Sequence, residues 1–148
     1  MQRSIHASVV LIGPKAALIR GPAGAGKSQL ALALIEAARA DALPFARLVA
    51  DDRALVEVQN GRLLVRPAPE LAGLIEVRGL GIRRLSYEPV AVAGLVVDLA
   101  AADAERLPAR AAAETPIEGI SLPRLAVAPG TPALPLVLAF LDTVPGCI

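Results

Sequence analysis

The segment Gly21-Pro22-Ala23-Gly24-Ala25-Gly26-Lys27-Ser28 has the G-x-x-x-x-G-K-[ST] spacing of a phosphate-binding P-loop. Its glycines let several backbone N–H groups converge on one anion. Lys27 supplies a mobile positive charge for the outer phosphates, and the Ser28 hydroxyl can ligate Mg²⁺. Residues 16–20 predict a strand and residues 27–40 a helix, so a bound phosphate would lie at a helix N-terminus. All eight loop residues are therefore candidate nucleotide ligands. The motif does not identify the reaction, because kinases, ATPases and regulatory switches all contain it.

A second candidate site follows the apolar residues Leu48-Val49-Ala50, which predict a buried strand that ends at Asp51-Asp52. In P-loop proteins an acid at the end of a neighbouring strand usually holds Mg²⁺. Two adjacent acids can divide the work, one holding the metal and the other accepting a proton from a substrate hydroxyl. The alternative is a solvated turn, in which an Asp pair is common.

The remaining pattern is rich in strands. Asn60-Gly61 is a strong signal for a hairpin between two strands, and Pro123 predicts that its strand lies at a sheet edge. Residues 100–113 are compatible with a broken helix or with a solvated connection. A terminal helix is expected over 132–142, with Pro135 in its first turn. The expected strands are 5–12, 16–20, 47–50, 54–58, 62–65, 75–82 (turning at its glycines), 90–99 and 122–127.

Size and composition narrow the function further. The 148 residues are 55% hydrophobic with a mean hydropathy of +0.58, which predicts one folded domain over residues 1–148. A net charge of +1, two Phe, one Tyr and no Trp argue against a nucleic-acid partner. Cys147 is the only cysteine, so no internal disulfide can form, as is typical of a reducing cytoplasm. No apolar run reaches the length of a membrane span and no signal peptide is evident, so we expect a cytoplasmic protein without a membrane partner.

Taken together, these segments resemble the C-terminal catalytic domain of the HPr kinase/phosphorylase family, which phosphorylates a serine of the phosphocarrier protein HPr. The resemblance covers most of the chain, and its most specific segment is Ile75-Glu76-Val77-Arg78-Gly79-Leu80-Gly81-Ile82. The other matching segments are Ile5-His6, the P-loop, Leu48 to Asp52 and, more faintly, Leu122-Pro123-Arg124-Leu125-Ala126-Val127. The implied fold is an α/β P-loop kinase domain of the HPr kinase and phosphoenolpyruvate carboxykinase-like type, a strand-rich sheet with flanking helices.

The resemblance also implies roles for the matching residues. Lys27 would bind the transferring phosphates, and Asp52 would be the general base for the serine hydroxyl. His6 would lie close to the phosphoryl group, and Arg78 would stand beside the signature turn. The implied metal ligands are Ser28, Asp51 and Glu76. On the residues alone, His6 could instead be structural, Glu76 and Arg78 could form a surface ion pair, and Arg124 could be a solvated edge residue.

The chain departs from the family in three places. It resembles a short form that lacks the family's N-terminal domain, its loop after Ile82 is shorter, and the loop near Pro129-Gly130-Thr131 is reduced. The last two departures argue against carrying over the family's reverse, phosphorylase reaction and its hexamer. The sequence therefore does not decide whether the chain forms a homo-oligomer.

The expected function is that of an ATP- and Mg²⁺-dependent serine kinase that acts on an HPr-like phosphocarrier of a phosphotransferase system. The alternatives are a P-loop kinase of a small hydroxylated metabolite and a nucleotide-binding sensor without catalysis.

Overall fold

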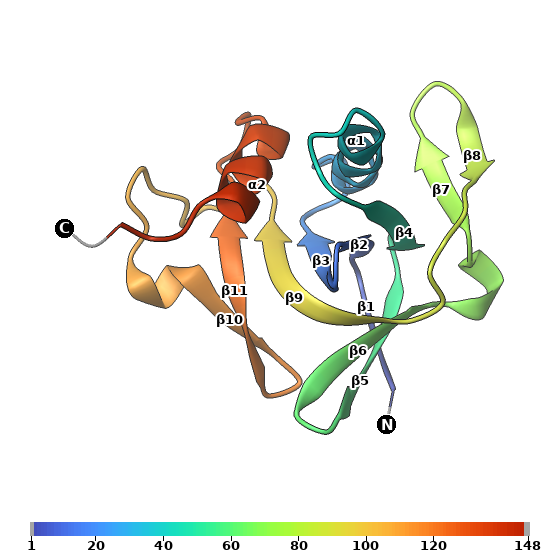
Figure 1. Cartoon of the computed structure of the whole chain (residues 1–148), viewed down its shortest axis with the longest axis horizontal. Helices are drawn as coiled ribbons and strands as arrows, with labels where there is room; N and C mark the ends of the chain where they lie inside the picture. The colour runs from blue at the N-terminus through green and yellow to red at the C-terminus, as the bar shows by residue number, and fades with distance from the viewer. Residues whose placement is uncertain (1, 147–148) are drawn as a thin grey trace.

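The computed structural model describes residues 2–146, so Cys147 lies outside the described residues. A mixed sheet carries two α-helices over the ends of its central strands (Figure 1). In chain order the elements are β1 (Arg3–Ile5), β2 (Ser8–Ile12), β3 (Lys15–Arg20), α1 (Lys27–Arg39), β4 (Ala46–Ala50), β5 (Ala54–Gln59), β6 (Arg62–Pro67), the 3₁₀ turn η1 (Pro69–Leu71), β7 (Leu74–Val77), β8 (Gly81–Arg84), β9 (Ala91–Asp98), the 3₁₀ turn η2 (Arg110–Ala113), β10 (Glu114–Ile117), β11 (Ile120–Ala126) and α2 (Ala133–Asp142).

The main sheet has the order β1-β5-β6-β9-β3-β2-β4, with β11 beside the end of β9 and β10 beside β11. The pairs β3–β9 and β9–β11 are parallel and the other pairs are antiparallel. The carboxyl ends of β3, β9 and β11 therefore meet at one edge, where α1 and α2 lie side by side (Figure 1). In open α/β sheets ligands bind at this edge.

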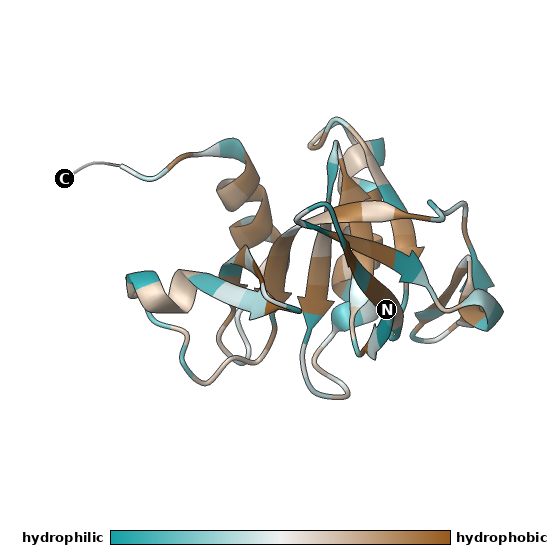
Figure 2. Cartoon of the chain, turned by 90° about the horizontal axis from the view of Figure 1, so that it is seen from below, coloured by the Kyte–Doolittle hydropathy of each residue, from teal (hydrophilic) through white to brown (hydrophobic). Residues whose placement is uncertain are grey.

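The two faces of the sheet bury separate cores because strand side chains alternate between faces. On β3, Ala16 and Leu18 face the core that β5 and β6 close, whereas Ala17 and Ile19 face the core under α1 and α2. The brown central strands in Figure 2 mark this apolar interior. Strand β9 shifts register at Gly94, where a Cβ would lie 2.7 Å from the Lys15 Cβ. The missing side chain lets this strand bend and serve both cores.

Several expectations from the sequence are confirmed. Both helices lie where they were expected, and Pro135 is in the first turn of α2. Asn60 and Gly61 have φ angles of 52° and 74°, as a type I′ hairpin turn between β5 and β6 requires. The α/β fold with a strand-rich sheet and flanking helices is also confirmed.

Three local expectations need correction, and the two alternatives for residues 100–113 are decided. Residues 5–12 do not form one strand, because β1 pairs with β5 while β2 pairs with β3 and β4. Residues 75–82 belong to a β7–β8 hairpin that forms its own two-stranded sheet. For residues 100–113 the structure agrees with the solvated connection and not with the broken helix, since they form mostly exposed turns and η2, and β10, which was not predicted, follows them. Strand β11 has a partner along each half, β10 for residues 120–123 and β9 for 124–126, so it links β10 to the main sheet instead of ending it.

Candidate active site

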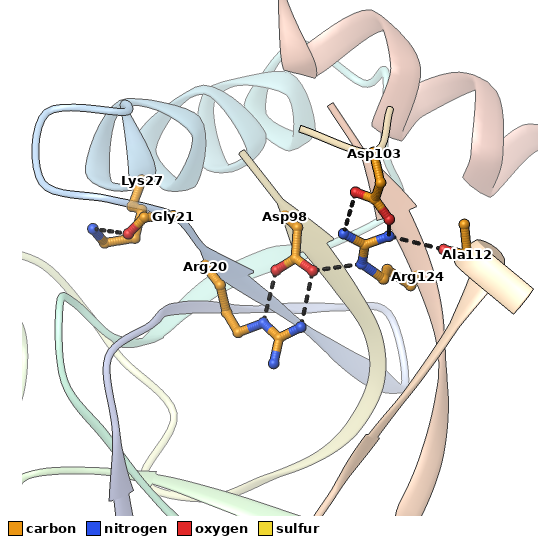
Figure 3. Close-up of polar contacts among 7 residues, drawn as sticks. All are labelled: Arg20, Gly21, Lys27, Asp98, Asp103, Ala112 and Arg124. Atoms are coloured by element: carbon orange, nitrogen blue, oxygen red, sulfur yellow. Dashed lines mark hydrogen bonds and ion pairs between the residues drawn. The ribbon is translucent and has the colours of Figure 1, made fainter. Parts of the chain in front are cut away.

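The P-loop joins the end of β3 to the start of α1 and depends on close backbone packing. A Cβ on Gly21 would lie 3.1 Å from the Leu99 Cβ, so a larger residue would displace the loop from the end of β9. Gly26 caps α1 with a φ of 100°, a left-handed conformation that glycine adopts without strain. The Lys27 ammonium donates to the carbonyl oxygen of Gly21 at 3.0 Å, which holds it over the loop (Figure 3).

Asp51 is the polar centre beneath this loop. Its side chain is buried, and its Oδ1 accepts hydrogen bonds from the hydroxyls of Ser8 and Ser28, each at 2.7 Å. Its Oδ2 accepts the backbone N–H of Glu76 at 3.0 Å. The carboxylate thus ties together β2, α1 and β7, which are distant in sequence. It also places a carboxylate oxygen beside the Ser28 hydroxyl, and both are the hard oxygen ligands that Mg²⁺ prefers.

Asp52 follows Asp51 but points elsewhere because the backbone turns between them. Asp52 has a φ of 66°, in the left-handed region that Asp and Asn tolerate better than most residues. Its backbone N–H donates to the Ser8 hydroxyl at 3.2 Å, and the N–H of Arg53 donates to the Asp51 carbonyl at 2.8 Å. The turn leaves Asp51 buried and Asp52 exposed, so the two acids occupy different environments.

The Asp52 side chain opens onto a cavity of about 270 Å³, which we call the charged cavity. It brings together residues from four parts of the sequence: the P-loop, α1, the β4–β5 turn and the β7–β8 hairpin. Its lining residues are Ala23, Gly24, Gly26, Lys27, Ser28, Gln29, Asp52, Glu76 and Arg78. A cationic ammonium, a hydroxyl and two carboxylates around one space can hold phosphate, a divalent cation and an acceptor hydroxyl.

The structure brings most of the candidate site residues together at the charged cavity and leaves His6 outside it. Lys27, Ser28, Asp52, Glu76 and Arg78 line the charged cavity, and Asp51 lies beneath it. Among its lining residues Glu76 and Arg78 are both exposed, and the ion pairs of the described residues do not include one between them. His6 is exposed on the two-residue connection between β1 and β2 and is not among the lining residues.

Sequence reasoning missed Ser8, which is fully buried and holds both aspartates of the β4–β5 turn. The available signal was a hydroxyl at the start of the apolar run Val9-Val10-Leu11. A buried hydroxyl needs a hydrogen-bond partner, and only the pairing of β2 with β4 shows that this partner is Asp51.

Sequence reasoning also missed an ion-pair network behind the P-loop (Figure 3). Arg20, the residue before the loop, donates to both carboxylate oxygens of Asp98 at 2.7 and 2.8 Å. Arg124 donates to Asp98 at 2.6 Å, to Asp103 at 2.9 and 3.0 Å, and to the Ala112 carbonyl at 3.0 Å. The Arg124 side chain is only 13% exposed, so its interpretation as a solvated edge residue is wrong. The network joins the ends of β3, β9 and β11 to the segment that carries Asp103.

The network should make stability depend on pH. Burial raises the pKa of Asp98, but the hydrogen bonds and charges of Arg20 and Arg124 outweigh burial, so the net pKa lies below its usual range. A carboxyl whose pKa is lowered by folding stabilises the protein above its unfolded value, about 3.9, and loses this contribution as the pH falls through the folded value. We therefore expect Asp98→Asn to lower the free energy of unfolding at pH 7 by about 2 kcal/mol. This cost lies between that of breaking an exposed ion pair and that of breaking a fully buried one.

Urea unfolding at pH 7 and pH 3 measures this dependence. The difference between wild type and Asp98→Asn should be smaller at pH 3 than at pH 7, because pH 3 lies below the unfolded pKa of about 3.9, where the stabilisation from a lowered pKa has begun to fall. Asp103→Asn is the matched control, because the hydrogen bond from Arg124 also lowers the pKa of Asp103 but its side chain is much more exposed. An Asp98→Asn deficit that is equally large at both pH values would contradict the assignment.

Among residues 2–146, no helix is long and apolar enough to cross a bilayer. Those residues also contain no group of three or more His, Cys, Asp or Glu side chains arranged to hold a metal ion. A Mg²⁺ site does not require such a group, since this ion is usually bound by one or two carboxylates together with substrate phosphates and water.

Comparison with known proteins agrees with this arrangement. Residues 1–87 match the family model described as the HPr Serine kinase C-terminal domain. The HPr kinase/phosphorylase of Lacticaseibacillus casei (strain BL23) is 42% identical over 82 residues, which are 55% of this chain and 24% of that protein. The HPr kinase/phosphorylase of Limosilactobacillus reuteri (strain DSM 20016) is 39% identical over 82 residues, 55% of this chain and 23% of that protein. The matched region thus spans about a quarter of these relatives' length.

A solved structure gives the same picture of the fold. The Hpr(Ser) kinase/phosphatase from Coxiella burnetii superposes with a TM-score of 0.76 at 24% sequence identity. The superposition covers 95% of this chain and 88% of that one. The likeness extends the shared fold beyond the segment that the family model matches.

Proposed function

Since the chain belongs to the HPr serine kinase C-terminal domain family, we propose that it is an ATP- and Mg²⁺-dependent kinase that phosphorylates a serine of an HPr-like phosphocarrier protein. The observation that carries the proposal is the charged cavity, where P-loop Lys27 and Ser28 share one space with Asp52 and Glu76. Phosphoryl transfer needs positioned phosphates, neutralised charge and an oriented hydroxyl, and these residues supply all three.

In this proposal each side chain has one task. The P-loop N–H groups and Lys27 bind the ATP phosphates, and Ser28, Asp51 and Glu76 would hold Mg²⁺. When bound, this ion neutralises charge on the phosphates. Asp52 accepts the proton of the serine hydroxyl while the bond from that oxygen to the γ-phosphorus forms and the bond from the γ-phosphorus to ADP breaks. Arg78 also lines the cavity, and in this proposal its positive charge attracts anionic groups of the acceptor protein.

The exposure of the acceptor side favours a protein substrate over a small metabolite. Asp52, Glu76 and Arg78 are all exposed, and Arg78 lies in the turn of the β7–β8 hairpin. A serine on the surface of a folded protein can approach carboxylates placed in this way, whereas a small metabolite is usually enclosed by its site.

Transfer of label from γ-labelled ATP tests the proposal directly. The chain, Mg²⁺ and an HPr-type phosphocarrier from the same organism should give label on one serine of the carrier. A carrier with alanine at that serine and a reaction with chelated Mg²⁺ are the controls, and both should stay unlabelled. Reversal is measured as loss of label from the phosphoserine carrier. ATP binding without any transfer would refute the protein-kinase proposal and support a metabolite kinase or a sensor.

A further inference from the structure

Arg20 is the residue that leads directly into the P-loop, and its side chain is held by Asp98. Its Nε and one terminal nitrogen donate to the two carboxylate oxygens at 2.7 and 2.8 Å, a forked pair that fixes both groups in one orientation. Arg20 and Asp98 are also direct partners in the parallel pairing of β3 with β9. The pair therefore fastens the last residue before the loop to the end of the neighbouring strand (Figure 3).

The backbone of the loop entrance is held from the same strand end. The N–H of Leu99, the residue after Asp98, donates to the Arg20 carbonyl at 2.8 Å. The next loop residue, Gly21, lies so close to Leu99 that an added Cβ would be 3.1 Å from the Leu99 Cβ and 3.2 Å from its carbonyl oxygen. The backbone and the side chain of Arg20 thus both connect the loop entrance to the end of β9.

The position of Lys27 depends on this entrance. Its ammonium donates to the carbonyl oxygens of Gly21 at 3.0 Å and Pro22 at 3.4 Å, and these are the two residues that follow Arg20. A shift at Arg20 moves both carbonyls, and the ammonium that they hold moves with them. A misplacement of about 1 Å in a catalytic site can reduce the rate about a hundredfold, so a small shift is enough to matter.

Arg20 is not placed to act as a phosphate ligand itself, because the described residues that line the charged cavity do not include it. Its network also carries no net charge, since it contains two positive and two negative side chains, those of Arg20, Arg124, Asp98 and Asp103. Its influence on a bound phosphate therefore comes from the position that it gives the loop and not from an added positive charge.

From these observations we infer that Arg20 and Asp98 are positioning residues for phosphate binding, which hold the P-loop entrance so that the Lys27 ammonium meets the transferring phosphates. The inference rests on the proposed function, because it assumes that the loop binds ATP. The P-loop motif begins at Gly21, so this role lies outside the motif. Only a forked guanidinium matches both carboxylate oxygens, so Arg20→Lys keeps the charge and loses the geometry.

Arg20→Lys tests the inference, with Mg-tripolyphosphate as a probe that offers the loop phosphates and nothing else. We expect the variant to weaken binding of this probe, measured by calorimetry, about tenfold, the factor expected when one charge-assisted hydrogen bond is lost. Arg124→Lys is the matched control, because Arg124 donates to the same carboxylate but lies on β11, outside the P-loop. The control should lose stability in urea and still bind the probe as wild type does.

Two double-mutant cycles separate positioning from a general loss of structure. If Arg20 acts through Lys27, Arg20→Lys should weaken binding of Mg-ATP in wild type and have no further effect in a Lys27→Met background. Asp98→Asn should weaken binding by the same route, and it repeats the test if Arg20→Lys does not fold. Arg20→Lys combined with Asp98→Asn should bind no more weakly than the weaker single variant, because both changes break one pair. Equal losses in the two Lys27 backgrounds, or additive losses from the pair, would overturn the inference.

The outcomes distinguish this inference from the proposed function. If wild type binds Mg-tripolyphosphate and Mg-ATP but transfers no phosphate to the carrier, the protein-kinase proposal fails while the binding results still decide the inference. If wild type binds neither ligand, both fail. If Arg20→Lys binds the probe as tightly as wild type, or if Arg124→Lys weakens binding as much as Arg20→Lys does, only the inference fails.

Discussion

Asp52→Asn should lower the rate of phosphoryl transfer to the phosphocarrier by about two to four orders of magnitude, the usual contribution of a general base. Asn keeps the size of the side chain but cannot accept the proton of the serine hydroxyl. It also tolerates the left-handed backbone of this turn, where Asp52 has a φ of 66°. An Ala variant would add backbone strain, so Asn isolates the loss of the carboxylate.

The measurement is the initial rate of transfer from γ-labelled ATP, together with the dissociation constant of Mg-ATP. The dissociation constant should change little, because Asp52 lies on the acceptor side of the P-loop. Asp41→Asn is a matched control: Asp41 also has a positive φ, of 63°, but lies after α1 and does not line the charged cavity. A full rate in Asp52→Asn would exclude Asp52 as the base.

Asp51→Ala should cost about 3 kcal/mol of unfolding free energy, because three donors lose their acceptor at once. The Ser8 hydroxyl is completely buried and cannot turn to water, and the Ser28 hydroxyl and the Glu76 N–H are partly buried. The same change removes a proposed Mg²⁺ ligand, so transfer activity should fall below detection at temperatures where the variant is still folded.

Urea unfolding measures the loss of stability, and two further variants give values with which the loss in Asp51→Ala can be compared. Ser8→Ala removes one of the three donors to Asp51 and also the acceptor of the Asp52 N–H, so it should cost about 2 kcal/mol, near the net value of two hydrogen bonds. Asp142→Ala, an exposed aspartate at the end of α2, should be neutral. If Asp51→Ala were no more destabilising than Ser8→Ala, Asp51 would not be the centre that joins β2, α1 and β7.

Some parts of the site could be predicted from the sequence and others could not. The P-loop and the two aspartates are contiguous segments, and each follows a run whose periodicity identifies a strand, so their placement at strand ends was predictable. The division of the two aspartates was not, because it depends on a left-handed turn at Asp52 that the Ser8 hydroxyl supports. Glu76 and Arg78 were identified only through the family resemblance. That a hairpin brings them to the charged cavity is seen only in the structure.

Missed elements have a common cause. Strand β10 is short, contains Pro116 and gains its pairing from β11 across the Glu118–Gly119 turn. Arg124 looked like a solvated residue beside Pro123, yet the parallel pairing of β11 with β9 places it next to Asp98. In both cases the deciding neighbour is set by sheet pairing, which local propensity does not encode.

From the amino-acid sequence alone came the α/β class, the two helices, the Asn60-Gly61 hairpin and the P-loop with its acidic partner segment, since each rests on local periodicity, turn chemistry or motif spacing. Three-dimensional packing set the burial of Asp51 under Ser8 and Ser28, the Arg20–Asp98–Arg124 network and the charged cavity between the P-loop, the β4–β5 turn and the β7–β8 hairpin. These features join residues from separate elements, and only the order and direction of the strands bring such residues within contact distance.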